Sequence, residues 1–473
     1  MKIIKYLMLI ALFINISYAK KVDDSIVKIY TVFKTPSYDT PWNSSIQSAS
    51  GSGVVIEGNR ILTNAHVVAN STFLEVKRNG DTKRYRAKVE FVSHQVDLAV
   101  IKLVDEKFFD GVEALKIGKR PVKEQKVSVY GFPLGGNTLS ITTGIVSRIE
   151  HISYVHSGEI FLGVQVDAAI NSGNSGGPAI TDGKIVGVVM QGMRNAQNVG
   201  YLISVDIINK FLEDIKDGKL DGFADLGLST MSMENPTIRE YYKMDKDTTG
   251  ILITQIAEVS KAYDKLKEGD ILLEIDGHKV ENDGKVEFEK GAFTYYSYYF
   301  DKKQIGESIP MTILRDGKKV KVLVELNNVT NKNLLVPSFQ YDKMPRYYIL
   351  GGYVFSPLTR NLLYGKKYSL LRLKLAQQEW ATKDKREIVV LLKVLATDLN
   401  RGDHNYSLFK IDKINNREFK DFKEFVDIIK KSKDKFIVLE GAKGAKIVID
   451  NIKAKAIEKE ILDRYNIKDS ERL

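Results

Sequence analysis

One short stretch of the sequence carries the strongest signal for chemistry. Residues 171–178 read NSGNSGGP, and the glycines around Ser175 allow the chain to make a tight turn. In such a turn the amides of Gly173, Asn174 and Ser175 can point to one side, where they would bind the oxyanion of a tetrahedral intermediate. This predicts a nucleophilic serine, and the alternative interpretation is an ordinary glycine-rich hairpin turn.

A serine hydroxyl is a weak nucleophile until a base accepts its proton, and His66 and Asp97 are the candidates for that task. His66 stands at the end of an apolar strand and the start of a short helical turn, in the stretch ILTNAHVV. Asp97 precedes the apolar residues 98–103, which predicts a half-buried carboxylate where a loop enters a strand. A core histidine bonded to backbone and an Asx turn that initiates a strand are the respective alternatives.

His66, Asp97 and Ser175 follow one another in the His, Asp, Ser order of the chymotrypsin-type template. Two competing residues are weaker candidates. His94 lies outside any strand-end motif and is expected at the surface. Asp167 precedes the serine by eight positions and could also orient a base.

Composition limits the other classes of function. The 473 residues are 43% hydrophobic, which excludes a mostly disordered protein, and they contain no cysteine, which excludes disulfides, thiol catalysis and cysteine-bound zinc. The net charge of +11 is spread along the chain, so a nucleic-acid-binding protein is a weak third hypothesis.

The first residues have the layout of a secretory signal peptide: Lys2 and Lys5, an apolar run, and small residues before position 20. We expect a leader over residues 1–19, cleaved after Ala19, and a periplasmic or secreted protein without a stable membrane span. An uncleaved anchor is the alternative.

The elements that must position the candidate residues are short β runs between residues 22 and 215, a pattern typical of a β-sandwich or barrel. The expected strands cover residues 53–56, 73–77, 87–92, 98–103, 127–130, 144–149, 161–166 and 185–190. A helix over 205–215 and a linker over 216–222 end this region. Two further units follow, with helices expected over residues 259–266 and 422–431.

The blocks GSGVVIEGNRILTNAHVV, VDLAVIKL, TTGIVSRIE and QVDAAINSGNSGGPAI resemble the HtrA/Deg serine proteases. The resemblance implies a mainly β chain with a chymotrypsin-like double β-barrel over residues 20–217. Two PDZ-like α+β domains would follow, over 223–328 and 335–456, and then a helical tail over 457–473. It also implies that His66 is the general base, Asp97 its orienting partner and Ser175 the nucleophile.

By the same resemblance, the specificity pocket would be lined by Ile170, Val189, Met190 and Gln191. No acidic residue occurs there, so we expect cleavage after small or medium apolar residues.

The resemblance further implies that Leu226, Gly227 and Leu228 form the carboxylate-binding loop of the first PDZ domain. Lys261 stands where the family has proline, and residues 288–300 are rich in aromatic side chains, so a packing surface is an equally good interpretation. Residues 336–359 and 386–402 resemble the divergent second PDZ-like domain of plant-type Deg proteases, which implies a role in assembly.

The expected function is an ATP-independent serine endopeptidase that degrades misfolded or damaged proteins in the cell envelope. It would need no metal or organic cofactor and would form a homo-oligomer built on trimers. The alternative is a chaperone or scaffold whose proteolysis is weak or conditional.

Overall fold

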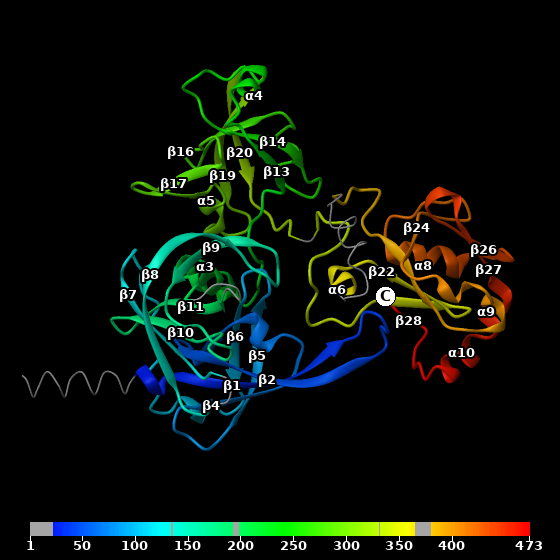
Figure 1. Cartoon of the computed structure of the whole chain (residues 1–473), viewed down its shortest axis with the longest axis horizontal. Helices are drawn as coiled ribbons and strands as arrows, with labels where there is room; N and C mark the ends of the chain where they lie inside the picture. Colours follow the sequence, from blue (N-terminus) through cyan, green and yellow to red (C-terminus); the bar gives the residue numbers. More distant parts are fainter. Residues whose placement is uncertain (1–21, 134–135, 193–197, 331, 365–379) are drawn as a thin grey trace, which may run out of the picture. The chain divides into compact units, whose positions relative to one another are not determined.

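The computed structural model describes residues 22–133, 136–192, 198–330, 332–364 and 380–473 (Figure 1). The leader expected over residues 1–19 lies outside this part of the chain. The chain divides into two compact units. Unit 1 consists of Met1–Phe33, Ile46–Gln255 and Asp264–Asn328, and unit 2 consists of Lys34–Ser45, Ile256–Tyr263 and Val329–Leu473.

Unit 1 begins with two closed six-stranded barrels, in the orders β1-β2-β3-β6-β5-β4 and β10-β11-β12-β9-β8-β7. The first barrel consists of β1 (Ile26–Pro36), β2 (Ser44–Ile56), β3 (Arg60–Thr63), β4 (Ser71–Arg78), β5 (Tyr85–Ser93) and β6 (Leu98–Leu103). The second consists of β7 (Lys126–Gly131), β8 (Ser140–Ser153), β9 (Ile160–Val166), β10 (Pro178–Thr181), β11 (Lys184–Gly192) and β12 (Gly200–Ser204). All eight expected strands fall within these elements, and the predicted double barrel is confirmed.

The barrels have buried cores because alternate residues of a strand point to opposite faces of its sheet. In β6, Ala99 and Ile101 pack in the first barrel, whereas Leu98 and Val100 join a larger core shared with the second barrel. That shared core also contains residues of α3 (Val205–Asp214), the helix expected over 205–215. A strand with both faces buried reads as the continuous apolar run seen in the sequence.

The segment after α3 is held in place rather than extended freely. The Asp214 carboxylate accepts the backbone N–H of Gly222 at 2.9 Å, and Lys210 Nζ donates to the Gly222 carbonyl at 3.0 Å. The linker expected over residues 216–222 is therefore fastened to the helix that precedes it.

A third sheet completes unit 1, in the order β13-β14-β15-β19-β20. Its strands are β13 (Leu228–Ser232), β14 (Ile251–Ile256), β15 (Ile271–Ile275), β19 (Ser308–Arg315) and β20 (Lys318–Glu325), with β16 (His278–Lys279) on β15. A hairpin of β17 (Lys285–Glu289) and β18 (Ala292–Tyr295) and the short helices α4 (Pro236–Tyr241) and α5 (Tyr298–Asp301) accompany it.

The helix expected over residues 259–266 is wrong. These residues form consecutive turns, in which the Ser260 side chain accepts the N–H of Ala262 and the N–H of Tyr263 donates to the Ser260 carbonyl. Within this segment Ala262 and Leu266 are among the few buried side chains, so little packing favours a helix over the local serine bonds.

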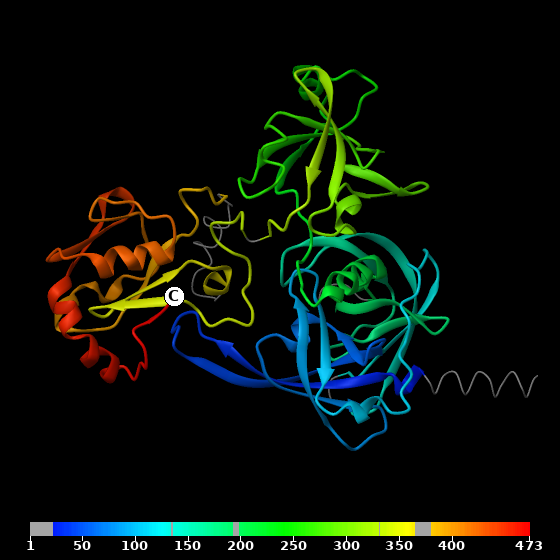
Figure 2. The same ribbon diagram turned by 180° about the vertical axis from the view of Figure 1, so that it is seen from behind.

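Unit 2 contains a five-stranded sheet in the order β24-β23-β22-β21-β28 and a three-stranded sheet of β25, β26 and β27 (Figure 2). Their bounds are β21 (Tyr347–Leu350), β22 (Tyr353–Pro357), β23 (Val389–Val394), β24 (Phe409–Ile411), β25 (Lys413–Ile414), β26 (Phe436–Glu440), β27 (Lys446–Asp450) and β28 (Glu471–Arg472). The helices are α6 (Arg360–Leu363), α8 (Phe422–Lys431), α9 (Asn451–Ala456) and α10 (Glu458–Arg464).

The helix α8 has the bounds expected from the sequence. Asp421 caps its N-terminus, and Phe422, Phe425 and Ile429 are buried in the core that it shares with β22 and β23. The tail over residues 457–473 holds α10 and then β28, which pairs with β21, so the end of the chain is part of the sheet as well as helical.

Candidate active site

His66 lies on α2 (Ala65–Val68), a short helical turn directly after β3, as its sequence context predicted. Its backbone N–H donates to Asp97 Oδ1 at 3.0 Å, and its Nδ1 lies 3.0 Å from Oδ1 and 2.8 Å from Oδ2 of the same carboxylate. A carboxylate only accepts hydrogen bonds, so we assign the proton to Nδ1 and the lone pair to Nε2. This is the tautomer that a general base requires.

The environment of His66 changes its proton affinity. Burial lowers the pKa of His66, but the charge of Asp97 and its hydrogen bond raise it, and the net pKa lies above the ordinary value of 6.5. A carboxylate that stabilises the imidazolium in this way makes the ring a better acceptor for a hydroxyl proton.

Asp97 is fully buried, and the prediction of a half-buried carboxylate is wrong. Its neighbours Val96 and Leu98 both lie in the core shared by the two barrels, and the side chain between them is carried inside. The backbone of Asp97 has a positive φ of 59°, and its carbonyl accepts the side-chain amide of Asn64 at 3.0 Å. Asp97 is thus held through hydrogen bonds to both its backbone carbonyl and its side chain.

The turn that carries Ser175 lies against the strand end that carries the histidine. Gly176 has a φ of 82°, and a Cβ atom there would lie 2.2 Å from Thr63 Oγ1 and 2.3 Å from the Ser52 carbonyl oxygen. Only glycine allows so close an approach. Thr63 stands three residues before His66, so the fold brings the three candidate residues into one region.

Two of the three expected oxyanion donors are available. The N–H of Asn174, the third expected donor, donates to the Asn171 carbonyl at 3.0 Å and closes the turn. The N–H groups of Gly173 and Ser175 have no hydrogen-bond partner within the described residues. Gly173 has a φ of 101°, a conformation that favours glycine.

The sequence reasoning missed a buried serine that supports this turn. Ser52 Oγ donates to the Gly173 carbonyl at 2.7 Å and accepts the N–H of Phe132 at 2.8 Å. The Ser52 N–H also donates to the Ser175 carbonyl at 2.9 Å. Its position between Gly51 and Gly53 was the available signal, because small neighbours allow two backbones to approach.

The residues expected in the specificity pocket have different surroundings. Ile170 is half-buried and lies against Gly200, where an added Cβ would meet its side chain at 2.3 Å. Val189 is buried in the core of the second barrel, and Met190 is buried in the core shared by the two barrels. The side-chain amide of Gln191 is bonded to the backbone of residues 153 and 155.

The competing candidates take other roles. Asp167 Oδ1 accepts the N–H of Ile145 in β8 at 2.6 Å, which is a structural contact. His94 is half-buried in the turn before Asp97.

In the expected carboxylate-binding loop, one backbone N–H already binds a carboxylate of this protein, that of Asp225. Asp225 Oδ1 accepts the N–H of Gly227 at 2.8 Å, while Leu226 is buried and Leu228 is half-buried. Burial raises the pKa of Asp225 even though this hydrogen bond lowers it.

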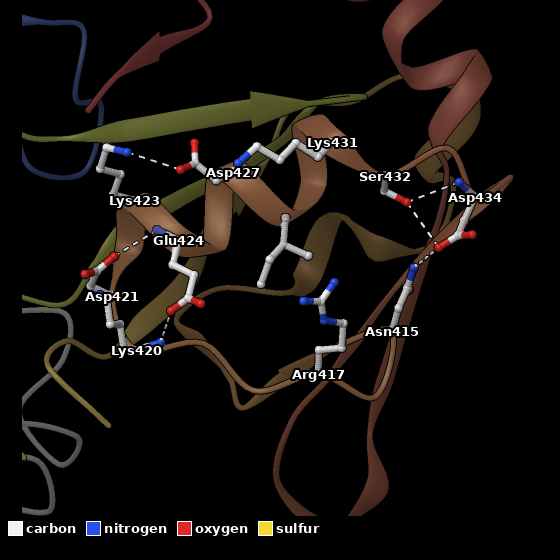
Figure 3. A pocket seen from close by; sticks show the side chains of 11 residues that line it. Asn415, Arg417, Lys420, Asp421, Lys423, Glu424, Asp427, Lys431, Ser432 and Asp434 are labelled. Carbon is white, nitrogen blue, oxygen red and sulfur yellow. Dashed lines mark hydrogen bonds and ion pairs between the residues drawn. The ribbon is translucent and has the colours of Figure 1, made fainter. Parts of the chain in front are cut away.

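A cavity of about 500 Å³ lies on unit 2, between α8 and the loop that precedes it (Figure 3). Its charged groups are largely bonded to one another: Lys423 Nζ lies 3.2 Å from Asp427 Oδ2, and Asp421 caps the helix at Glu424. Its lining has no histidine or cysteine and no serine beside a base, so it has none of the chemistry gathered around His66.

Comparison with known proteins identifies the family. A trypsin-like peptidase domain matches residues 51–188, and a PDZ domain matches residues 336–471. Protease Do-like 4, mitochondrial, of Arabidopsis thaliana is 36% identical over 446 residues, which cover 94% of this chain and 84% of that protein. The chain belongs to the Deg (Do-like) family of serine proteases.

A second Deg protein agrees with this assignment, and a solved structure shares the fold. Protease Do-like 2, chloroplastic, of Arabidopsis thaliana is 36% identical over 425 residues, covering 88% of this chain and 69% of that protein. The solved structure of the HtrA-type protease AlgW with a decapeptide shares the fold, with a TM-score of 0.51 and 22% identity over 66% of this chain and 98% of that one. As a Deg protease with a trypsin-like domain, the chain is a serine endopeptidase.

Among the described helices, none has the length and apolar character needed to cross a membrane.

Proposed function

We propose that this Deg protease is an ATP-independent endopeptidase that degrades misfolded or damaged proteins, with His66, Asp97 and Ser175 as its catalytic triad. One observation carries the proposal. The fully buried Asp97 carboxylate binds both the backbone N–H and Nδ1 of His66 and leaves Nε2 to accept a proton.

In the proposed mechanism His66 Nε2 accepts the hydroxyl proton of Ser175 as Oγ attacks the substrate carbonyl carbon. The negative charge that forms on the carbonyl oxygen is met by the amides of Gly173 and Ser175. Protonated His66 then gives its proton to the leaving amine, which breaks the peptide bond and leaves an acyl-enzyme. Water, deprotonated by the same histidine, hydrolyses the ester and restores the serine.

The first test compares casein degradation by the wild-type protein, Ser175→Ala and His66→Ala. We expect each variant to lose turnover on the order of a millionfold, as when a serine-protease triad is broken. Ser172→Ala is the matched control, because Ser172 is an exposed serine in the same glycine-rich stretch and should keep activity. Full activity of Ser175→Ala would overturn the triad.

The same assay separates the protease from a chaperone or scaffold. If neither the wild-type protein nor Ser175→Ala cleaves casein, and both suppress aggregation of an unfolded client, the chaperone function replaces the proposal. A cleavage rate that rises with unfolded client would support a role in protein quality control.

Specificity, assembly and location are further parts of the proposal. The apolar side chain of Ile170 beside β12 favours cleavage after small or medium apolar residues, which sequencing of the casein fragments would test. We also propose a trimer-based homo-oligomer, to be measured by light scattering, and export to the periplasm or outside with cleavage after Ala19. N-terminal sequencing of the native protein would test the export, because a cleaved leader leaves Lys20 as the first residue. The two relatives named above are instead mitochondrial and chloroplastic by name.

A further inference from the structure

Tyr154 places a buried hydroxyl group beside the proposed general base. The residue follows β8 directly, and only 1% of it is exposed, in the core shared by the two barrels. Its Oη lies 3.4 Å from Nδ1 of His66. A phenylalanine would fill the same volume without a hydroxyl that has to be satisfied in the interior. The contact between this hydroxyl and His66 therefore calls for an explanation beyond the packing of the ring.

The hydroxyl oxygen faces a nitrogen that is already a donor. Nδ1 of His66 donates to Asp97 at 2.8 Å, so Tyr154 Oη can act toward it only as a second, weaker acceptor. At 3.4 Å the contact is at the outer limit of a hydrogen bond. Its main effects are to close the edge of the imidazole beside Asp97 and to place a partial negative charge next to Nδ1.

A second ring lies nearly parallel to the imidazole. The ring of His156 stacks on His66 with 5.6 Å between centroids and 14° between planes. Tyr154 and His156 also contact each other, with centroids 5.3 Å apart. The ring of His66 thus has Asp97 and Tyr154 at one edge and the offset, nearly parallel ring of His156 beside it.

These two side chains come from one tight turn, residues 154–159. The N–H of Tyr154 donates to the Glu159 carbonyl at 2.9 Å, and the N–H of Gly158 donates back to the Tyr154 carbonyl at 2.8 Å. The turn is tied to the segment that carries Asp97, because Ser157 Oγ donates to the carbonyl of Gln95 at 3.0 Å.

The same turn is tied to β11 on its other side. Gln191 Nε2 donates to the Ser153 carbonyl at 3.2 Å, and Gln191 Oε1 accepts the N–H of Val155 at 3.3 Å. With anchors on two sides, the turn holds the Tyr154 and His156 rings at a fixed distance from the histidine.

We propose that Tyr154 is a positioning residue for His66, which with the ring of His156 holds the imidazole in the orientation that presents Nε2 to Ser175. The inference rests on the proposed role of His66 as general base. Tyr154 acts through the histidine and has no contact with substrate in this role.

The test uses Tyr154→Phe in the full chain, which removes the hydroxyl and keeps the ring. We expect kcat to fall roughly fivefold, the effect of losing one weak hydrogen bond, with KM unchanged. The acid limb of the kcat/KM profile should move to lower pH, because the oxygen that helps to stabilise the imidazolium is gone. The charged or titratable groups that face His66 in this geometry are Asp97, Tyr154 and His156.

Two further variants complete the experiment. His156→Gln removes the stacked ring from an exposed position, so it leaves the core intact and should also lower kcat. Tyr85→Phe is the control: it removes a hydroxyl from a tyrosine that is 7% exposed in the core of the first barrel, and kcat should not change. A purely structural role for Tyr154 would change thermal stability without moving the acid limb.

The outcomes distinguish the inference from the proposed function. If His66→Ala is inactive while Tyr154→Phe and His156→Gln keep the wild-type kcat and acid limb, the positioning role is wrong and the triad stands. If His66→Ala keeps activity, the triad and the positioning role are both wrong.

Discussion

At the scale of single residues, the proposed mechanism depends on the carboxylate of Asp97. Asp97→Asn would keep the shape of the side chain but present an N–H group to Nδ1 of His66, which favours the wrong tautomer. We expect kcat to fall roughly 10⁴-fold, as for the same substitution in a Ser-His-Asp protease. Turnover of a fluorogenic peptide measures this. Asp167→Asn, whose side chain can still accept from Ile145, should keep most of its activity.

The pH dependence of cleavage follows from the same pair. The pKa of His66 lies above its ordinary value, lowered by burial but raised more by Asp97. Because protonated His66 cannot accept the serine proton, kcat/KM should fall as the pH drops through this raised pKa, so the acid limb should have its midpoint above 6.5. A pH profile of kcat/KM measures the midpoint, and a midpoint below 6.5 would contradict the prediction.

The sequence was informative about the type and order of these residues and much less about their surroundings. Glycines around Ser175 and apolar residues around His66 and Asp97 are local signals. The bond from Asn174 to Asn171 depends on the exact backbone path of the turn, so no spacing rule could remove Asn174 from the expected donors. Tyr154 reaches the histidine only through the pairing of β8 in the second barrel, which a linear pattern does not show.

At the scale of elements, the serine turn depends on a close approach that one added methyl group would prevent. Gly176→Ala would place a Cβ 2.2 Å from Thr63 Oγ1, and Gly291→Ala is a matched control with a similar positive φ and open space around it. Both variants carry backbone strain of about 1 kcal/mol, but only Gly176→Ala also displaces the turn from β3. We expect Gly176→Ala to lose activity and stability and Gly291→Ala to keep its activity.

Casein turnover and chemical denaturation of both variants would measure this difference. Equal losses in the two proteins would show that strain alone matters and that the approach to Thr63 does not. Strands such as β6 were predictable because their apolar runs are buried on both faces, and strands such as β4 because apolar and polar residues alternate. Residues 259–266 were not, since Ser260 offers the backbone hydrogen bonds that compete with a helix.

At the scale of the whole molecule, the order of domains could be predicted from the sequence, but the make-up of unit 2 could not. Residues Lys34–Ser45, which comprise the end of β1, the following loop and the start of β2, belong to the same compact unit as Val329–Leu473. Tyr38 and Trp42 of this segment pack against the core that contains Tyr347. Hydrophobic periodicity reports which face of an element is buried, and it does not report which distant segment covers that face.

Trp42 provides the test of this long-range packing. Its ring meets that of Tyr347 edge to face with centroids 5.8 Å apart, and Arg472 Nη1 donates to the neighbouring Pro41 carbonyl at 3.0 Å. Because Trp42 is only half-buried, Trp42→Ala should cost about 2–3 kcal/mol, less than for a fully buried tryptophan.

The loss should be local to unit 2, since Trp42 packs there and not in the barrels. Hydrogen exchange of the full-length protein should therefore become faster in β21, which contains Tyr347, while the strand β6 exchanges as in the wild-type protein. Ile46→Ala is the control, because that side chain is 74% exposed in the neighbouring strand β2 and should leave exchange in β21 unchanged. Unchanged exchange of β21 in Trp42→Ala would mean that the segment adds no stability to unit 2.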